Sequence, residues 1–378
     1  MTVAPPPGPA RAYAVIAAFA AELVERGVTE LVVSPGSRST PLTVTLDAHP
    51  GLRTWIHLDE RVAGFFALGQ GRATGRPAVL VCTSGTAAAN YLPAVIEAHH
   101  AGVPLVVCSA DRPPELRGGW GSSQTIDQVG LYGPTTRWAV DLPVAGEWTP
   151  EAARATAARA VAAATGPDPG PVHLNWPLRE PLEPPGAVPV VDARPRPAAT
   201  VGPPPLDEAT RRLCDELVGV GRGVVVAGPS PGEGLAAEHR TATAVVRAAA
   251  AVGWPVLADP LTQMRGAASD ADPVVAHADL LLRHEALASL APELVVLVGH
   301  PPVTKPVRLW LERHRPARVV AVDPARRWPD PSFTTTDRVG AHPRVVAAHL
   351  EAATAGPADP SWLATWRRAD AVAADVVV

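Results

Sequence analysis

Residues 34–41 read Ser-Pro-Gly-Ser-Arg-Ser-Thr-Pro and follow a short apolar run over residues 31–33. Thr40 is a residue type that caps helix N-termini, and Pro41 then stands where its missing N–H costs nothing. The pattern therefore predicts a strand, a turn and a helix in succession. The turn combines free backbone N–H groups with the guanidinium of Arg38, and this combination receives anions.

The same strand, turn and helix pattern repeats three more times along the chain. Apolar runs at 54–58, 78–82 and 105–108 lead into Asp59-Glu60-Arg61, Thr83-Ser84-Gly85-Thr86 and Asp111-Arg112-Pro113. Parallel strands that alternate with helices bring such turns to one edge of the sheet, where open α/β sheets bind ligands. We therefore expect Glu60 to meet Arg38 and Arg112 at this edge, with Ser84 beside them. One carboxylate and two guanidiniums indicate an acid/base residue next to a site for a carboxylated substrate.

The length of 378 residues suits two domains, and the alternation of strands and helices predicts an α/β fold. We expect two doubly wound parallel-sheet domains. A helix at 150–164, capped by Thr149, and a strand at 172–176 complete the first; the second has strands at 224–227, 256–258, 294–298 and 319–322. The predicted division is a first domain over 1–182, a proline-rich linker over 183–206, a middle domain over 207–355 and a helical segment over 356–378.

Composition excludes several classes of partner. The net charge of −4 gives no reason to expect nucleic acid or an anionic membrane. No apolar run is long enough to span a bilayer, and residues 1–9 do not read as a signal peptide. The three cysteines, Cys82, Cys108 and Cys214, are isolated, and their spacing suits neither a zinc site nor a disulfide framework. We expect a cytoplasmic protein without membrane insertion and without metal ligands in these two domains.

Taken singly, the polar residues at the predicted sheet edge have ordinary explanations. Glu60 in a first helical turn is favourable to the helix dipole, and exposed arginines are usually ion-pair partners. It is their convergence that favours a functional site. Lys305, the only lysine of the chain, is predicted at a helix start, where a cation has no local rationale unless an anion binds.

Four ordered motifs together resemble one enzyme family closely. They are SPGSRSTPL at 34–42, DERVAGF at 59–65, TSGTA at 83–87 and SADRPPEL at 109–116. This combination resembles the 2-succinyl-5-enolpyruvyl-6-hydroxy-3-cyclohexene-1-carboxylate synthases, thiamine-diphosphate-dependent transferases of menaquinone biosynthesis. The match is dense over residues 11–138 and looser beyond. The resemblance implies decarboxylation of 2-oxoglutarate and addition of the resulting succinyl-semialdehyde carbanion to isochorismate.

The resemblance also implies roles for individual residues. Glu60 matches the catalytic glutamate that hydrogen-bonds N1′ of the cofactor's aminopyrimidine and so promotes proton removal from the thiazolium. The other cofactor-binding positions are Pro35, Ser84, Thr86 and Asn90. The substrate-binding positions are Ser37, Arg38, Arg112, Ser123, Gln124 and Lys305. Both substrates carry carboxylates, which accounts physically for the arginines. The family's usual Asn-Gln pair reads Ser123-Gln124 here.

Members of the family hold Mg²⁺ and the cofactor's diphosphate in a third domain, through a Gly-Asp…Asn motif. No Gly-Asp dipeptide occurs in this sequence, and its only asparagines are Asn90 and Asn175. The resemblance therefore implies that the chain lacks that domain and is inactive alone, with the Mg²⁺ ligands in the missing part. It also implies a homo-oligomer, either a dimer or a tetramer.

Two alternatives remain open at this point. One is another thiamine-diphosphate-dependent 2-oxoacid decarboxylase or ligase, such as an acetolactate-synthase relative. The paired arginines disfavour it, and turnover of isochorismate plus 2-oxoglutarate against pyruvate would decide. The other is a non-catalytic binding or assembly module.

Overall fold

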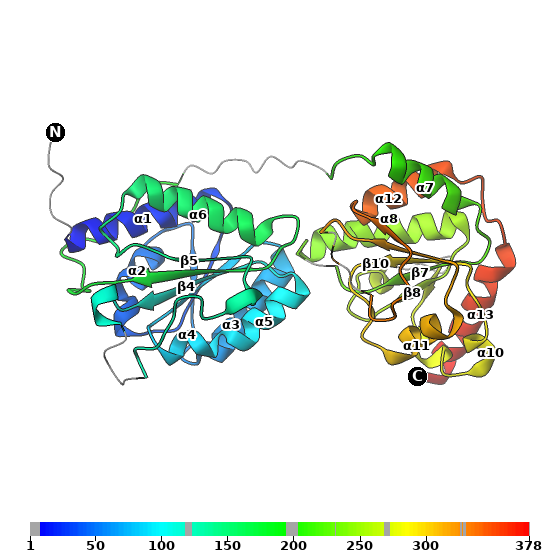
Figure 1. Cartoon of the computed structure of the whole chain (residues 1–378), viewed down its shortest axis with the longest axis horizontal. Coiled ribbons are helices and arrows are strands. Elements are labelled where there is room, and N and C mark those ends of the chain that lie inside the picture. Colours follow the sequence, from blue (N-terminus) through cyan, green and yellow to red (C-terminus); the bar gives the residue numbers. More distant parts are fainter. Residues whose placement is uncertain are drawn as a thin grey trace. The chain divides into compact units, whose positions relative to one another are not determined.

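The computed structural model describes residues 8–117, 123–193, 203–230, 232–267, 273–325, 327 and 330–377. The chain divides into two compact units, Met1–Thr200 and Val201–Val378. Each unit is built on one six-stranded sheet, and every paired strand in both sheets is parallel (Figure 1). The prediction of two doubly wound parallel-sheet domains is confirmed.

The first sheet has the strand order β2-β1-β3-β4-β6-β5. Its strands are β1 (Glu30–Val33), β2 (Arg53–Ile56), β3 (Ala78–Cys82), β4 (Leu105–Asp111), β5 (Trp138–Asp141) and β6 (Pro171–Pro177). All residues of β3, β4 and β6 are buried, because helices cover both faces of the sheet. This burial explains why the central strands read as continuous apolar runs in the sequence.

Six helices cover the two faces of this sheet. They are α1 (Pro9–Glu25), α2 (Thr40–Asp47), α3 (Glu60–Thr74), α4 (Thr86–Asn90), α5 (Leu92–Ala101) and α6 (Pro150–Thr165). Helices α1, α2 and α6 pack against alternate strand residues such as Val79 and Val81. Helices α3, α4 and α5 pack against the intervening ones, such as Leu80 and Cys82. Short 3₁₀ turns occur at Ser37–Ser39, Pro114–Leu116 and Gly133–Thr135.

The second sheet has the order β12-β11-β10-β7-β8-β9. Its strands are β7 (Gly223–Ala227), β8 (Val256–Ala258), β9 (Val274–Val275), β10 (Leu294–Val298), β11 (Arg318–Val322) and β12 (Asp337–Val339). Its helices are α7 (Glu208–Val218), α8 (Leu235–Val252), α9 (Ala278–Leu281), α10 (Glu285–Ala288), α11 (Lys305–His314), α12 (Pro343–Ala353) and α13 (Pro360–Val377). A 3₁₀ turn spans Arg265–Ala267. Helices α7, α8 and α12 share one core with the sheet, and α9, α11 and α13 share the other.

The last helix is an integral part of the second unit. The sequence offers no evident partner for this segment, but α13 buries Trp362 and Trp366 against the sheet. The Trp362 indole N–H donates to the Gly223 carbonyl over 2.9 Å, and the ring of Trp366 meets that of Trp310 edge-on at 5.8 Å. Apolar burial of two indoles therefore holds α13 on β7 and α11.

Two local details of the first unit differ from the sequence prediction. The N-cap of α2 is Ser39, one residue before the predicted Thr40, because the hydroxyl of Thr40 donates to the Ser37 carbonyl and closes a 3₁₀ turn. The helical stretch predicted after the turn at 83–86 is divided at Tyr91 into α4 and α5. Pro93 lies in the first turn of α5, where its missing N–H is tolerated, and this explains the division.

Three short edge or near-edge strands are absent from the sequence prediction. They are β5, β9 and β12, with four, two and three residues. Strands this short present too few apolar residues to stand out from loops, and β5 alternates half-buried and exposed side chains.

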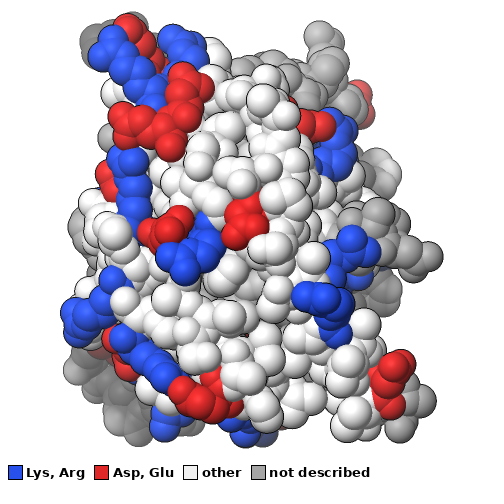
Figure 2. All heavy atoms as spheres, turned by 90° about the vertical axis from the view of Figure 1, so that its right-hand side faces the viewer, with Lys and Arg blue, Asp and Glu red and all other residues white. Residues whose placement is uncertain are grey.

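Acidic and basic side chains are interspersed on the face of the molecule shown in Figure 2. Broad uncharged areas separate them, and neither sign forms a continuous field on that face. A bilayer-crossing helix would need a longer apolar stretch than any helix in the described part of the chain provides.

Candidate active site

Turns that follow β1 and β3 interlock at the carboxyl edge of the first sheet. A Cβ atom on Gly36 would lie 2.4 Å from Cβ of Thr83, so only glycine allows the two turns to approach this closely. Gly85 has φ +87°, and a Cβ there would lie 2.2 Å from the carbonyl oxygen of Ser123. The Thr86 N–H donates to that same carbonyl over 2.9 Å. The fold thus gathers the predicted cofactor turn and the Ser123 segment at one place.

Arg38 is the most buried cation of this edge, with 8% of its surface exposed. Its Nη1 donates to the Leu178 carbonyl over 3.1 Å, and its Nη2 pairs with Oε1 of Glu180 at 2.9 Å. The buried Nε has no hydrogen-bond partner among the described residues. Burial lowers the pKa of the Arg38 guanidinium, and the positive charge of Arg112 lowers it further. The site therefore holds two neighbouring cations and one unused donor, which favours an anionic ligand.

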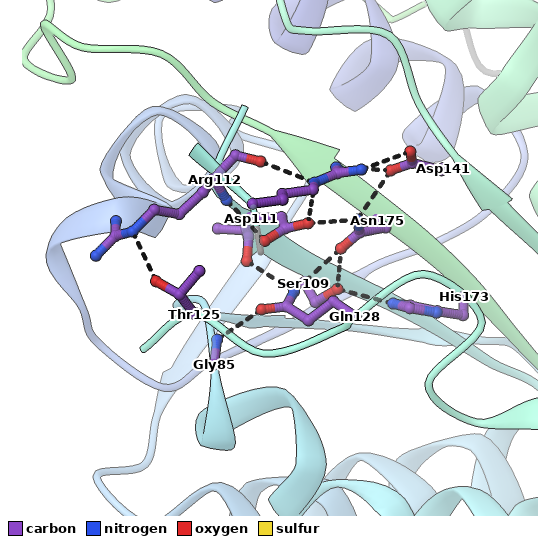
Figure 3. Close-up of polar contacts among 11 residues, drawn as sticks. Gly85, Ser109, Asp111, Arg112, Thr125, Gln128, Asp141, His173 and Asn175 are labelled. Carbon is purple, nitrogen blue, oxygen red and sulfur yellow. Dashed lines mark hydrogen bonds and ion pairs between the residues drawn. The ribbon is translucent and has the colours of Figure 1, made fainter. Parts of the chain in front are cut away.

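Arg112 follows β4 directly and is half-buried. Its backbone N–H donates to Oδ1 of Asp111 over 2.7 Å, and its Nε donates to the Thr125 hydroxyl over 3.1 Å. Figure 3 shows the guanidinium extending away from Asp111 toward Thr125. Arg38 follows β1 and Arg112 follows β4, so both lie at the carboxyl edge of the same parallel sheet, as predicted.

Glu60 is the first residue of α3, where Asp59 caps the helix by accepting from the N–H groups of Arg61 and Val62. The Glu60 carboxylate is half-buried and has no hydrogen-bond partner among the described residues. Burial raises the pKa of the Cys82 thiol well above its ordinary value, and the charge of Glu60 raises it further. The Glu60 carboxylate thus lies close to the buried end of β3, with its acceptor capacity unused.

The remaining predicted positions differ in their surroundings. Ser84 is buried, whereas Pro35, Ser37, Thr86, Asn90, Ser123 and Gln124 are exposed. The side-chain amide of Asn90 donates to the Thr86 carbonyl over 3.1 Å and so folds back on its own helix. Ser84 and Thr86 flank the constrained Gly85, so their positions follow from that turn.

Lys305 belongs to the second unit, whereas all the other predicted site residues belong to the first. It is the exposed first residue of α11, and no described residue forms a hydrogen bond or ion pair with it. The neighbouring Arg308 pairs with Glu312 at 2.5 Å. Lys305 thus has its whole ammonium group available to an external anion, whereas Arg308 shares its charge with Glu312.

A buried polar network behind the site was not anticipated from the sequence. Its central residue is Asn175 on β6, whose Nδ2 donates to Oδ2 of Asp111 over 2.8 Å and to Oδ1 of Asp141 over 2.9 Å. The Asn175 Oδ1 accepts from Ser109 and from Gln128 over 3.1 and 3.0 Å (Figure 3). Because each amide group meets complementary partners, the network is satisfied in one orientation only.

His173 closes this network on the side away from the site. Its Nε2 lies 2.7 Å from the Ser109 hydroxyl, whose hydrogen is directed to Asn175, so Nε2 carries the imidazole hydrogen. Burial lowers the pKa of His173 from 6.5 to about 4, and the nearby charge of Asp141 opposes this. His173 is therefore neutral in the folded state at physiological pH.

We expect His173 to make the first domain acid-sensitive. A folded-state pKa below the unfolded value leaves stability intact above pH 6.5 and removes it as the pH falls toward about 4. The contribution over that window is about 3 kcal/mol. Urea unfolding of the chain and of His173→Gln should be compared from pH 7.5 to 4.5. The stability difference between the two proteins should shrink on acidification, and a difference independent of pH would contradict the prediction.

Among the described residues, no group of three or more histidine, cysteine, aspartate or glutamate side chains is arranged to hold a metal ion. The three cysteines are buried free thiols.

Comparisons with known proteins bear on both units. The family description "Thiamine pyrophosphate enzyme, N-terminal TPP binding domain" matches residues 14–131, and "Middle domain of thiamine pyrophosphate" matches residues 208–378. These matches follow the two sheets in order along the chain.

Curated relatives with one shared description match across both units. They are named 2-succinyl-5-enolpyruvyl-6-hydroxy-3-cyclohexene-1-carboxylate synthase. The protein from Geobacillus thermodenitrificans is 44% identical over 376 residues, covering 96% of this chain and 62% of the relative. Those from Halorubrum lacusprofundi and Chloroflexus aurantiacus are 44% and 41% identical, covering 94% and 96% of this chain and 60% and 62% of the relatives.

The chain thus spans about three fifths of the length of these relatives. The two family matches and the identity over nearly the whole chain agree with the fold and with the four sheet-edge motifs. This chain belongs to the thiamine pyrophosphate enzymes, and its two domains are the N-terminal and middle domains of that family.

Proposed function

We propose that these two domains serve a thiamine-diphosphate-dependent 2-succinyl-5-enolpyruvyl-6-hydroxy-3-cyclohexene-1-carboxylate synthase. The reaction would combine 2-oxoglutarate, with loss of CO₂, and isochorismate. The single observation that carries the proposal is that Arg38, Glu60 and Arg112 follow β1, β2 and β4 at one edge of a parallel sheet. The names of the relatives support the choice of substrates.

The residues present fit the aminopyrimidine half of thiamine diphosphate. Glu60 offers a half-buried carboxylate with no hydrogen-bond partner among the described residues, beside an apolar strand end. When bound, the cofactor supplies the thiazolium carbon that adds to a 2-oxoacid and takes up the charge left by CO₂. Glu60 would hold the proton at N1′, and the turn of Ser84 and Thr86 would position the ring, with Pro35 and Asn90 beside it.

The cations would bind the substrate carboxylates. Arg38 has a buried Nε without a hydrogen-bond partner among the described residues, and the charge of Arg112 contributes to the lowered pKa of Arg38. Two such groups orient a dicarboxylic substrate better than one, because each planar fork fixes a direction as well as a charge. Ser37, Ser123 and Gln124 border the same edge, and we propose that Lys305 contributes from the middle domain. The resemblance to the synthases extends the proposal to Mg²⁺ as the ion that accompanies the diphosphate.

Activity can be tested in a chimeric synthase, in which residues 1–378 are joined to the part of the Geobacillus thermodenitrificans relative that this chain does not cover. Formation of the succinyl product from 2-oxoglutarate and isochorismate, dependent on thiamine diphosphate and Mg²⁺, is the expected result. The relative itself, assayed in parallel, is the control for assay conditions. Turnover of pyruvate in preference to 2-oxoglutarate would instead favour an acetolactate-synthase type of reaction.

We also propose that the chain forms a homo-oligomer through the surface around the start of α3. Edge strand β2 and α3 expose apolar side chains there: Ile56 is 68%, Leu58 86%, Val62 54% and Phe65 48% exposed. An apolar cluster beside a functional edge is typical of a subunit contact. A second copy of the chain is the occupant that the resemblance implies. The buried free thiols are consistent with a reducing cytoplasm, which we propose as its location.

The association surface yields its own prediction. Phe65→Glu should weaken self-association at least about tenfold, because it places a charge in a surface from which association removes water. Sedimentation of the 378-residue chain over a concentration series measures this. Leu309→Glu, which changes an exposed leucine of α11 in the second unit, is the matched control. Equal masses for both variants and the parent chain at every concentration would refute this surface.

A further inference from the structure

Gln128 is a buried residue with a fixed orientation, and it contacts the turn at the heart of the site. Only 1% of its surface is exposed. Its Oε1 accepts from the Gly85 N–H over 2.6 Å, and its Nε2 donates to the Ala110 carbonyl over 3.1 Å and to Oδ1 of Asn175 over 3.0 Å. Both amide hydrogens and one acceptor site are therefore used.

The orientation of Gln128 is dictated by two carboxylates at the ends of β4 and β5, Asp111 and Asp141. Asp111 and Asp141 can only accept when ionised, so the Asn175 amide nitrogen must face them. The Asn175 oxygen then faces Gln128, whose own nitrogen must turn toward it. As a result, the Gln128 oxygen is left facing Gly85, as Figure 3 shows. The carboxylates of Asp111 and Asp141 thus orient the Asn175 amide, and Asn175 orients the Gln128 amide. This fixes the Gln128 oxygen as the acceptor of the Gly85 N–H.

The same network also reaches the arginine side of the site. Oδ1 of Asp111 accepts from the Arg112 N–H over 2.7 Å. Arg117 pairs with Asp111 at 2.9 Å and with Asp141 at 2.8 Å, and its charge opposes the burial that raises the pKa of Asp111. The Gly85 turn and Arg112 are therefore held by one set of hydrogen bonds, although neither touches the other.

We propose that Gln128 and Asn175 are positioning residues that set the Gly85 turn, and with it Ser84 and Thr86, relative to Arg112. The inference rests on the proposed function, in which the Gly85 turn contacts the cofactor and Arg112 contacts the substrate. The Gly85 N–H bond to Gln128 holds one side of the turn, and the Thr86 N–H bond to the Ser123 carbonyl holds the other. Loss of the Gln128 acceptor frees the turn.

The first experiment uses the 378-residue chain and needs no activity. Gln128→Met keeps the length of the side chain but removes the acceptor, so amide hydrogen exchange of the segment 83–88 should speed up at least about tenfold. Gln128→Glu keeps an oxygen acceptor for Gly85 but loses the amide hydrogens that the Ala110 carbonyl and Asn175 accept, so it should recover only part of the protection. Val95→Ala, a cavity in the same core on α5, controls for general loss of stability. Equal exchange in all four proteins would overturn the proposed contact.

The second experiment measures the consequence for the site in the chimeric synthase. Gln128→Met should raise the thiamine diphosphate concentration for half-maximal activity about tenfold, at a temperature where every variant is folded. Val95→Ala should leave it unchanged. Faster amide exchange in Gln128→Met, without a change in the thiamine diphosphate concentration for half-maximal activity, would overturn the positioning role. If the unaltered chimera makes no succinyl product, the proposed function fails, while the exchange experiment still decides whether Gln128 holds the turn.

Discussion

Glu60→Gln is expected to lower turnover of the chimeric synthase by about 10²–10⁴-fold while leaving the fold of both domains unchanged. Glu60 opens α3 and is only half-buried, and its carboxylate has no hydrogen-bond partner among the described residues. Replacement by the isosteric amide therefore removes no internal contact. It removes an ionised acceptor from the position where the aminopyrimidine nitrogen would need one.

Steady-state turnover and circular dichroism of the bound cofactor together measure this effect. The variant should bind thiamine diphosphate yet fail to activate it, so that kcat falls much more than the affinity for cofactor. Glu97→Gln, an exposed change on α5, is the matched control and should have no effect. Activity of Glu60→Gln within about threefold of the parent would rule out an acid/base role, because positioned groups of this kind contribute far more.

Arg38→Ala and Arg112→Ala should each raise the KM of a carboxylate substrate by about 10- to 150-fold, the value of one charge-assisted, bidentate contact. Thiamine diphosphate affinity should change little in either variant. The arginines lie near each other, since the charge of Arg112 lowers the pKa of Arg38. Both arginines should therefore contact the same anionic ligand, each from a different side.

Initial rates with either substrate varied separately would assign each arginine. Arg38→Lys and Arg112→Lys are the informative companions, because lysine keeps the charge but loses the planar fork. They should recover only part of the loss. Lys305→Ala belongs in the same series, with an effect on KM in the same direction. Loss of cofactor binding with unaltered KM values would show that the arginines serve the cofactor instead.

The sequence predicts most of the fold because the central strands are buried on both faces and therefore read as apolar runs. This holds for β3 and β10, whose boundaries are predicted to the residue. It fails for β5, whose four residues alternate. The helical character of α13 is predicted correctly, but the sequence gives no indication of what its tryptophans contact. Packing partners distant in sequence leave no local pattern.

The site likewise contains residues that the sequence predicts and residues that it does not. Arg38 and Arg112 follow strands, so the geometry of a parallel sheet alone predicts that they converge. Gln128 reaches Gly85 across 43 positions and Asn175 across 47, and no periodicity encodes such contacts. One signal was nevertheless present: Asn175 is a polar residue within the apolar run of β6. A buried side-chain amide in a strand needs hydrogen-bond partners, so the sequence alone indicates that Asn175 belongs to a polar network.

The pairing of Arg38 with Glu180 has a consequence for how any carboxylate enters the site. The Glu180 side chain is 71% exposed, so it can withdraw into solvent at little cost, whereas the guanidinium is confined. An incoming substrate would replace an anion that is already present. Substrate binding then exchanges the Glu180 carboxylate on Arg38 for a substrate carboxylate. The measured affinity is the difference in free energy between these two similar ion pairs. In the proposed synthase, Glu180 would favour release of a charged product, because it competes with that product for Arg38.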